Sequence, residues 1–287
     1  MKVSLIGIGL MGHALSEHLI AEVQQLTLFN RSPDKTVQLQ QQGAAIATSA
    51  QEALDASEYC LLMLSDADAI NSVLDTISAE SFKDKTIIQM GTIAPDESRA
   101  VSKRITDNHG HYLECPVLGS LPEARTGTLI LMAGGSDADY EAALPLLKLI
   151  GKAPQHIGDT GQGSTVKLAM NQLIAGLTSS FALSLALVEK EGIEVEQFMK
   201  VVRDSALYAP TFDKKLDRML ERNFANPNFP TKHLAKDTRL FLSVAKRLGL
   251  ETCALEGIDK LLDKTLEQGL DNTDYSALYS GVSKPKL

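Results

Sequence analysis

The chain has 287 residues, a formal net charge of −8 at pH 7 and hydrophobic side chains at 44% of its positions. The length indicates about two domains, and this hydrophobic content suffices for a core in each. The acidic balance argues against a general nucleic-acid-binding protein, which presents a basic face, and no unbroken apolar run reaches the ~18 residues that cross a bilayer.

The first predicted elements surround a glycine-rich turn. The apolar run 3–6 meets Gly7-Ile8-Gly9-Leu10-Met11-Gly12, and an amphipathic stretch then leads to a second apolar run that ends at Phe29. Strand, G-x-G-x-x-G turn, helix and strand is the context in which this motif binds a dinucleotide. Gly7 allows the tight turn, Gly9 lets the backbone approach a pyrophosphate, and Gly12 lets the helix pack on the strand. The phosphates are expected at the helix N-terminus.

The residues after the second strand indicate which dinucleotide binds. NAD sites carry Asp or Glu there, where it accepts hydrogen bonds from the ribose hydroxyls. This chain has Asn30, followed by Arg31 and Ser32. A guanidinium pairs with a 2′-phosphate that a carboxylate would repel, and Asn30 and Ser32 add neutral hydrogen bonds. The sequence favours NADP(H), with a solvated loop arginine as the alternative for Arg31.

Short apolar runs continue to alternate with segments of helical period through the first half of the chain. They lie at 26–29, 44–46, 59–64, 86–89, 112–115, 128–132 and about 153–157. This alternation indicates βαβ units and a mainly parallel, doubly wound α/β sheet. Ligands of such sheets bind beyond the carboxyl ends of the strands. The strand ends of interest are Leu64-Ser65-Asp66, Met90-Gly91-Thr92 and the segment 114–120.

After Gly158 the pattern becomes helical. A segment from about 164 to 191 contains no proline and is apolar on most of its surface, which predicts a helix about 40 Å long that can link two domains. Such a helix is buried in a large core or between subunits, and Gly192 fits its C-cap. Further helices are predicted near 195–205, 211–222, 231–248 and 251–268, with no strand candidate, and the tail at 283–286 is expected to fray.

These elements divide the chain into two predicted domains. Residues 1–162 form an NADP-binding Rossmann domain, and residues 163–287 form an all-helical domain for substrate binding and oligomerisation. The long apolar helix predicts a homo-oligomer, either a dimer or a tetramer, because large exposed apolar surfaces mark interfaces.

Lys167 is the candidate for the chemistry. It lies one turn into the long helix among apolar or small neighbours, and Asn171 follows four residues later on the same helix face. A buried lysine loses hydration, and its pKa falls toward the range where it donates and accepts protons near neutrality. Asn171 can hold the lysine or the substrate oxygen without adding charge. A lysine that snorkels from the start of a helix is the alternative.

The cysteines and histidines indicate no metal and no disulfide. Cys60, Cys115 and Cys253 are odd in number and far apart, and the histidines show no ligand spacing. The apolar start superficially resembles a signal peptide, but its removal would delete the first strand and the phosphate loop. The sequence therefore predicts a cytoplasmic protein with reduced thiols.

Over its whole length the chain resembles a β-hydroxyacid dehydrogenase, the family of 3-hydroxyisobutyrate dehydrogenase, tartronate semialdehyde reductase and the glyoxylate/succinic semialdehyde reductases. The similarity is carried by the glycine turn, Asn30-Arg31-Ser32, Gly91-Thr92, Pro116-Val117, Gly161-Gln162-Gly163-Ser164-Thr165-Val166-Lys167-Leu168-Ala169-Met170-Asn171 and Phe229-Pro230-Thr231-Lys232-His233-Leu234-Ala235-Lys236-Asp237. Asn30-Arg31 and the Phe-Pro-x-Lys-His segment also match the NADPH-dependent glyoxylate/succinic semialdehyde branch.

The resemblance implies a Rossmann domain, a helical domain built on the long helix, and an active site between them. It implies that Lys167 is the general acid/base with Asn171 as its partner. The cofactor is expected to lie across the strand ends at Leu64 and Ser65, with Thr92 and Lys236 in contact with it. Phe229 and Asp237 are expected to border the substrate pocket.

One position departs from that branch. Where it usually reads Glu/Asp-Ala-Pro-Val-Ser-Gly, this chain has Leu118 in place of the serine whose hydroxyl helps hold the substrate. Ser120 and the backbone N–H groups around Gly119 are candidates to replace it, and Arg125 is either a further carboxylate anchor or a surface residue. Alternatively, Leu118 packs into the sheet–helix core.

The predicted reaction is NADPH-dependent reduction of a small aldehyde acid, of the glyoxylate or succinic semialdehyde type, to the hydroxy acid, with protonated Lys167 neutralising the developing alkoxide. The alternatives are 3-hydroxyisobutyrate or tartronate semialdehyde dehydrogenase activity and an imine reductase, which shares the architecture but commonly replaces the lysine. A non-catalytic NADP-binding protein and 6-phosphogluconate dehydrogenase fit less well, because Lys167 is retained and the C-terminal region is short. The physiological substrate stays open.

Overall fold

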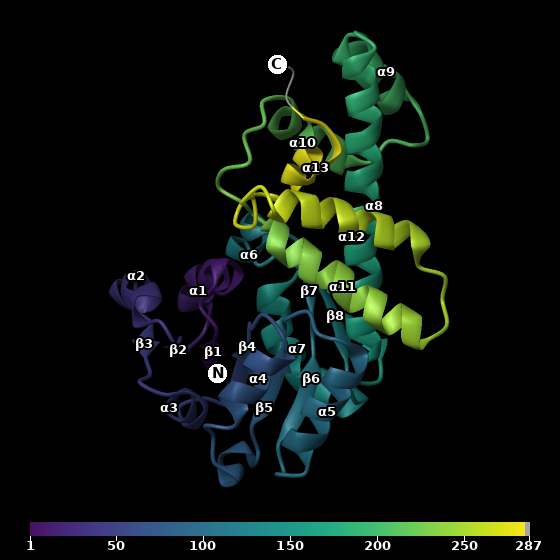
Figure 1. The fold of residues 1–287 in the computed structure, drawn as a ribbon. Coiled ribbons are helices and arrows are strands. Elements are labelled where there is room, and N and C mark those ends of the chain that lie inside the picture. The colour runs from purple at the N-terminus through teal and green to yellow at the C-terminus, as the bar shows by residue number, and fades with distance from the viewer. Residues whose placement is uncertain (285–287) are drawn as a thin grey trace. The chain divides into compact units, whose positions relative to one another are not determined.

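The computed structural model describes residues 1–284 and divides the chain into two compact units. The first unit is Met1–Lys167, and the second begins at Leu168. The division falls inside one long helix, α8 (Gln162–Lys190), whereas the sequence placed the domain boundary at the start of that helix (Figure 1). Positions 285 and 286 of the tail that was expected to fray lie outside the described residues.

The first unit is built on a mainly parallel sheet with the strand order β3-β2-β1-β4-β5-β6-β8-β7, and β9 pairs with β8. The strands are β1 (Lys2–Ile6), β2 (Gln25–Phe29), β3 (Ala45–Ile46), β4 (Tyr59–Leu62), β5 (Thr86–Gln89), β6 (His111–Glu114), β7 (Val117–Leu118), β8 (Ile130–Gly134) and β9 (Gln155–Gly158). β1 pairs in parallel with β2 on one side and β4 on the other, so the strand order reverses there. Among the strand pairs within residues 1–284, only those of β8 with β6 and β7 are antiparallel. The predicted doubly wound fold is confirmed.

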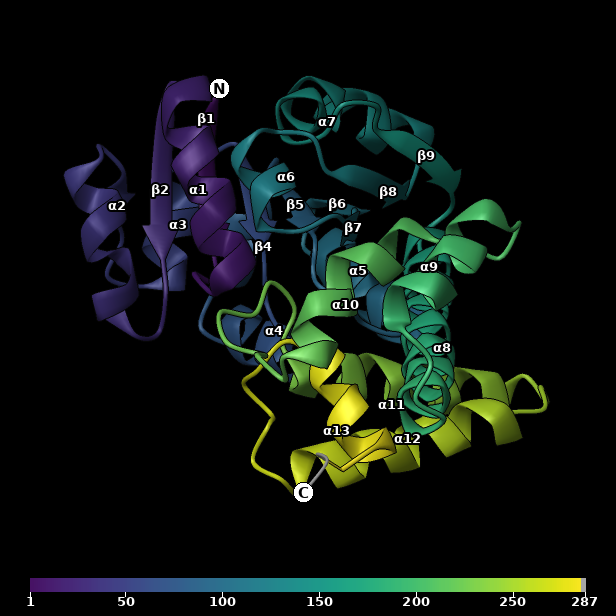
Figure 2. The same ribbon diagram turned by 90° about the horizontal axis from the view of Figure 1, so that it is seen from above.

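Helices cover both faces of this sheet. They are α1 (Leu10–Glu22), α2 (Val37–Gln41), α3 (Ala50–Asp55), α4 (Ala67–Leu74), α5 (Pro95–Thr106), α6 (Leu121–Arg125) and α7 (Asp137–Ile150). Alternate residues of β1 enter different cores, because successive strand side chains point to opposite faces. Leu5 packs with α1 and α7, whereas Ile6 packs with α3, α4 and α5. Figure 2 shows α7 alongside β8 and β9.

The second unit contains only helices within residues 168–284. Besides the remainder of α8 they are α9 (Val195–Asp204), α10 (Pro210–Leu220), α11 (Thr231–Arg247), α12 (Cys253–Leu266) and α13 (Leu278–Val282). Their core contains Phe181, Met199, Leu234, Leu262 and Tyr279. The sequence predicted the longer helices to within two residues at each end and missed α13, which is too short to show a period.

Helix α8 is long and apolar enough to cross a membrane by length and composition alone, with a mean hydropathy of 1.4. Polar residues interrupt its apolar pattern, so the sequence shows no unbroken apolar run of that length. Phe181, Ala182 and Leu185 lie in the core of the second unit, and a core helix of a soluble protein passes the same test. The opposite face exposes Leu173, Leu177, Leu183 and Leu187. The sequence predicted burial in a large core or between subunits, and the core covers only one face of the helix.

Candidate active site

The glycine turn joins β1 to α1 through close backbone contacts. Gly7 has φ +105°, and a Cβ there would lie 2.3 Å from the carbonyl oxygen of Met63. A Cβ at Gly12 would lie 2.1 Å from the carbonyl oxygen of Gly7. A Cβ at Gly9 would meet no atom within 4 Å, so the backbone borders open space there. No side chain caps α1 and its first turn holds no acid, which suits a bound pyrophosphate.

Asn30 ties the glycine turn to the end of β2. Its Oδ1 accepts a hydrogen bond from the backbone N of Ile8 at 2.9 Å, and its Nδ2 donates to the carbonyl oxygen of Ser32 at 2.9 Å. Each end of the amide thus makes one backbone bond and keeps the capacity for a second one, and the cofactor bonds expected from Asn30 stay a prediction. The neighbouring Arg31 is exposed.

The strand ends expected to line the cofactor site meet at one edge of the sheet. A Cβ at Gly7 would lie 2.9 Å from the Leu64 side chain, and a Cβ at Gly91 would lie 2.3 Å from the carbonyl oxygen of Leu64. Ser65 Oγ donates to Asp66 at 2.7 Å, and Asp66 also caps α4. Thr92 follows Gly91 and is half-buried. The first unit therefore brings Gly7, Leu64 and Gly91 together.

The segment after β6 gives Leu118 and its neighbour different surroundings. Val117 is 8% exposed and belongs to the core, whereas Leu118 is half-buried and is paired with Ile130 on β8. Adjacent strand residues point to opposite faces, so the geometry favours a Leu118 side chain directed away from that core. Ser120 Oγ is buried with no hydrogen-bond partner among the described residues. An unpaired buried hydroxyl suits a ligand-binding role.

Arg125 lies in a surface ion pair. Its Nε donates to Glu17 Oε2 at 2.7 Å, and its side chain is half exposed. This is the surface alternative that the sequence left open.

The start of α8 is held by Glu114, which belongs to the strand end 114–120 and for which the sequence predicted no role. Glu114 Oε1 accepts hydrogen bonds from the backbone N of Gly161 at 2.8 Å and of Ser164 at 3.0 Å. Ser164 Oγ donates to Oε2 at 2.7 Å, and Ser98 Oγ donates to the same oxygen. Lys167 follows in the next turn and is half-buried. The sequence contained a signal for this role: Glu114 lies within a short apolar run, and a carboxylate buried there requires hydrogen-bond partners.

In the second unit the structure brings together three predicted site residues, Asn171, Lys236 and Asp237. Asn171 and Asp237 are 2% and 3% exposed, and Asn171 Nδ2 donates to Asp237 Oδ2 at 2.6 Å. Lys236 Nζ lies 2.9 Å from Asp237 Oδ1. Asn171 Oδ1 is buried with no hydrogen-bond partner within residues 1–284. The amide therefore faces Asp237 with its donor end and leaves its acceptor end for another group.

Phe229 lies in an aromatic group at the start of α11. Its ring centroid is 6.3 Å from that of His233 and 5.8 Å from that of Tyr275. Burial lowers the pKa of His233 below its ordinary value, with Lys232 and Lys236 acting in the same direction. His233 is therefore neutral at pH 7.

Within residues 1–284 no metal cluster is indicated, and the two buried cysteines are unsuited to thiol chemistry. No group of three His, Cys, Asp or Glu side chains there could hold a metal ion. Burial raises the pKa of Cys60 to about 11 and raises that of Cys115 further. Both thiols therefore stay protonated and are poor nucleophiles.

Comparison with known proteins assigns both units to one group of enzymes. Residues 2–158 match the family model of the NAD binding domain of 6-phosphogluconate dehydrogenase. Residues 161–282 match the model described as NAD-binding of NADP-dependent 3-hydroxyisobutyrate dehydrogenase. The chain belongs to the β-hydroxyacid dehydrogenase family.

Two relatives match this chain over nearly its full length. It is 30% identical to 2-hydroxy-3-oxopropionate reductase of Escherichia coli K12 over 288 residues, covering 98% of this chain and 97% of the relative. It is 29% identical to glyoxylate/succinic semialdehyde reductase 1 of Arabidopsis thaliana over 285 residues, covering 98% of each. The structure of 3-hydroxyisobutyrate dehydrogenase from Salmonella typhimurium superposes with a TM-score of 0.87 at 23% identity, covering 98% of this chain and 99% of that one, and shares its fold.

Membership of the β-hydroxyacid dehydrogenases makes this protein an NAD(P)-dependent oxidoreductase that acts on CH–OH groups. Its cofactor is NADP(H). The predicted family, enzyme class and cofactor are confirmed.

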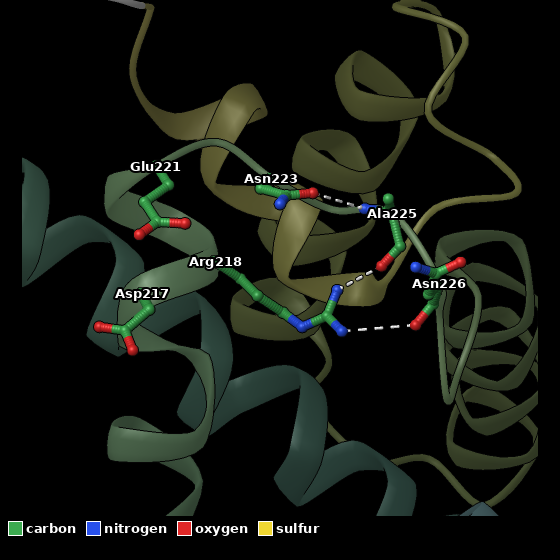
Figure 3. A pocket seen from close by; sticks show the side chains of 6 residues that line it. All are labelled: Asp217, Arg218, Glu221, Asn223, Ala225 and Asn226. Atoms are coloured by element: carbon green, nitrogen blue, oxygen red, sulfur yellow. Dashed lines mark hydrogen bonds between the residues drawn. The ribbon is translucent and has the colours of Figure 1, made fainter.

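A surface pocket of the second unit is lined by none of the predicted site residues (Figure 3). It measures about 250 Å³ and is lined by Asp217, Arg218, Glu221, Asn223, Ala225 and Asn226. The Arg218 guanidinium donates to the carbonyl oxygens of Ala225 at 2.6 Å and Asn226 at 3.4 Å. The backbone therefore already engages the cation of this pocket.

Two alanine substitutions in the glycine turn are expected to separate folding from cofactor binding. Gly12→Ala forces a Cβ against the Gly7 carbonyl oxygen and should destabilise the cofactor-free protein by about 1–3 kcal/mol. Gly9→Ala meets no protein atom within 4 Å, so it should leave that stability unchanged and weaken NADPH binding. Thermal unfolding without cofactor and a fluorescence titration with NADPH measure the two effects. A Gly9→Ala variant that binds NADPH as tightly as the wild type contradicts the assignment.

Proposed function

We propose that this dehydrogenase reduces a small aldehyde acid, of the glyoxylate or succinic semialdehyde type, to the hydroxy acid, with Lys167 as the general acid. The observation that carries the proposal is the buried Asn171 amide, one helical turn after Lys167, whose donor end is held by Asp237. Lys167 and Asn171 share one face of α8, because residues four apart are neighbours on a helix.

The residues of the first unit fit the cofactor. Gly7, Ile8, Gly9, Leu10, Met11 and Gly12 present an open backbone at an uncapped helix start, and Arg31 is exposed for a 2′-phosphate. We assign further cofactor contacts to Asn30, Ser32, Leu64, Ser65, Thr92 and Lys236. NADPH supplies the hydride when it is bound.

The protein's part in the reaction is proton transfer and charge stabilisation. Protonated Lys167 donates its proton to the carbonyl oxygen as negative charge develops there. Asn171 Oδ1 is a buried acceptor, so it can receive a hydrogen bond from the Lys167 ammonium or from the product hydroxyl. Asp237 keeps the amide in that orientation because a carboxylate accepts only from the Nδ2 end.

Substrate anchoring is assigned to Leu118, Gly119, Ser120, Phe229 and Asp237. The unpartnered Ser120 Oγ supports a role in holding a carboxylate, in place of the hydroxyl that Leu118 lacks. An imine reductase activity is the second candidate, since Leu118 makes this region less polar. A panel of glyoxylate, succinic semialdehyde, tartronate semialdehyde, methylmalonate semialdehyde and a cyclic imine, each with NADPH, distinguishes the two.

We further propose that the enzyme is a cytoplasmic homo-oligomer, a dimer or a tetramer. The exposed leucines of α8, Leu173, Leu177, Leu183 and Leu187, support this state, since such apolar surface favours association. A light-scattering mass matching the 31.0 kDa monomer at micromolar concentration would contradict it.

Lys167→Ala is expected to lower kcat by about 10²–10⁴-fold, the usual contribution of a general acid, while NADPH binding stays nearly intact. Steady-state kinetics and a fluorescence titration measure the two quantities. Lys152→Ala is the matched control, because Lys152 is exposed and lies outside the assigned site. A Lys167→Ala rate above roughly a tenth of the wild-type rate shows that the lysine is structural.

The wild-type enzyme is expected to prefer NADPH to NADH, because Arg31 is assigned to the 2′-phosphate. Equal kcat/KM values for NADPH and NADH contradict that assignment.

Leu118→Ser is expected to raise kcat/KM for glyoxylate and to lower it for the larger natural aldehyde. The change should be ~1–3 kcal/mol, the usual contribution of a single hydrogen bond or of a single buried apolar group. Val117→Ala is the control, because Val117 belongs to the core and its truncation should lower Tm without changing the order of substrates. If Leu118→Ser behaves like Val117→Ala, the leucine is a packing residue.

A further inference from the structure

We propose that Glu114 is a positioning residue, which anchors the first turn of α8 and thereby sets the direction in which Lys167 leaves the helix. The inference rests on the function proposed for Lys167 and adds a residue outside the reacting groups. All residues that carry it lie within the first unit.

The Glu114 carboxylate acts as a cap that comes from another part of the chain. Glu114 ends β6 and is 0% exposed. It accepts hydrogen bonds from two backbone N–H groups at the start of α8, those of Gly161 and Ser164. Those donors belong to the orphan N–H groups that every helix start leaves unsatisfied. The carboxylate also accepts from the Ser164 hydroxyl, so three bonds converge on one helical turn.

The surroundings of Glu114 contain no opposite charge among the described residues. No Lys, Arg or His forms an ion pair with it in residues 1–284, and each of its hydrogen bonds comes from a neutral donor. Burying an unpaired carboxylate is costly, and the partial positive charge at the N-terminus of α8 offsets part of that cost. A short polar residue next to α8 would cap it at lower cost. A buried carboxylate at the end of β6 instead ties the first turn of α8 to the sheet, and we infer that it fixes the point at which the helix begins.

A second chain of bonds fixes the carboxylate itself. Ser98 Oγ donates to Glu114 Oε2 and lies 2.8 Å from the Tyr112 hydroxyl. Burial raises the pKa of Tyr112 far above its ordinary value, so its phenol keeps the proton that it donates to Ser98. Ser98 of α5 and Tyr112 of β6 therefore hold Oε2 of Glu114 in place, while Oε1 receives the two backbone bonds of α8.

This anchor reaches Lys167 through one turn of helix. Ser164 and Lys167 are three residues apart and are neighbours on the helix surface. A Cβ at Gly163 would lie 2.3 Å from the carbonyl oxygen of Met132, so the first turn of α8 packs directly on the backbone of β8. Loss of the anchor would let this turn shift, and a displacement of about 1 Å can reduce a rate by 10²-fold.

Glu114→Ala and Glu114→Gln form the matched pair for the test. Alanine removes every bond of the anchor. Glutamine has nearly the same shape, its oxygen accepts from the two backbone N–H groups, and its NH₂ group donates to the two serine hydroxyls, which accept as well as donate. We expect Glu114→Ala to lower kcat by about 10–100-fold with unchanged NADPH affinity, and Glu114→Gln to retain most of the rate.

The decisive measurement is a double-mutant cycle with Lys167→Ala, using NADPH and the best aldehyde of the substrate panel. If Glu114 acts through Lys167, adding Glu114→Ala to Lys167→Ala should change the residual kcat by less than about twofold. If it lowers the residual kcat by the same factor as in the wild type, the positioning role is overturned and Glu114 only supports folding. A Lys167→Ala variant that keeps its rate overturns the proposed function first, independently of any Glu114 variant.

Circular dichroism establishes the folded fraction of each variant and corrects kcat for it. If Glu114→Ala does not fold, Ser164→Ala replaces it in the cycle, because it removes one bond to the carboxylate and leaves the two backbone bonds. A kcat loss for Ser164→Ala that disappears in the Lys167→Ala background supports the positioning role, and an additive loss overturns it.

Discussion

A parallel sheet ends its strands at one edge, and in the first unit this constraint brings together residues that we assign to the cofactor. β1, β4 and β5 are neighbours in the sheet, so the turns that follow them crowd together. The crowding is close enough that a Cβ at Gly7 or Gly91 would strike the carbonyl oxygens of Met63 and Leu64 at 2.3 Å. Backbone contact at this distance tolerates only glycine, whereas a Cβ at Gly9 would meet no atom within 4 Å, which supports its assignment to the cofactor.

Buried carboxylates play the equivalent part along α8. Glu114 holds the start of the helix in the first unit, and Asp237 holds Asn171 in the second. Each accepts directed hydrogen bonds, whereas apolar packing would allow a helix to slide or roll. Lys167 lies one helical turn after Ser164, which is bonded to Glu114, and Asn171 is itself bonded to Asp237. The two residues assigned to the chemistry are therefore those whose section of helix is fixed by directional bonds.

The sequence predicts the repeating parts of this structure better than its long-range bonds. Alternating apolar runs and the spacing of glycines were enough to predict the Rossmann fold and the helical second half, because these signals are local. The bonds of Glu114 to Ser164 and of Asn171 to Asp237 join residues 50 and 66 positions apart, and no spacing rule indicates them. The same bonds explain a boundary error: α8 begins at Gln162, before the first apolar residues, because a distant carboxylate caps it. The two-residue strand β7 is too short to show alternation.

That short strand also sets the surroundings of the residues that we assign to the substrate. Because β7 pairs with β8, Val117 is placed in the core and Leu118 on the opposite side. A serine at position 118 would add a hydroxyl there, and this chain instead has a hydroxyl at Ser120 that is buried and unpaired within the described residues. A buried hydroxyl without a partner costs about 1–3 kcal/mol, a cost that a bound carboxylate or carbonyl oxygen removes. The apolar side chain at position 118 and the unsatisfied hydroxyl of Ser120 therefore support the same interpretation. In it, the hydroxyl of Ser120 anchors the substrate in place of a serine at position 118.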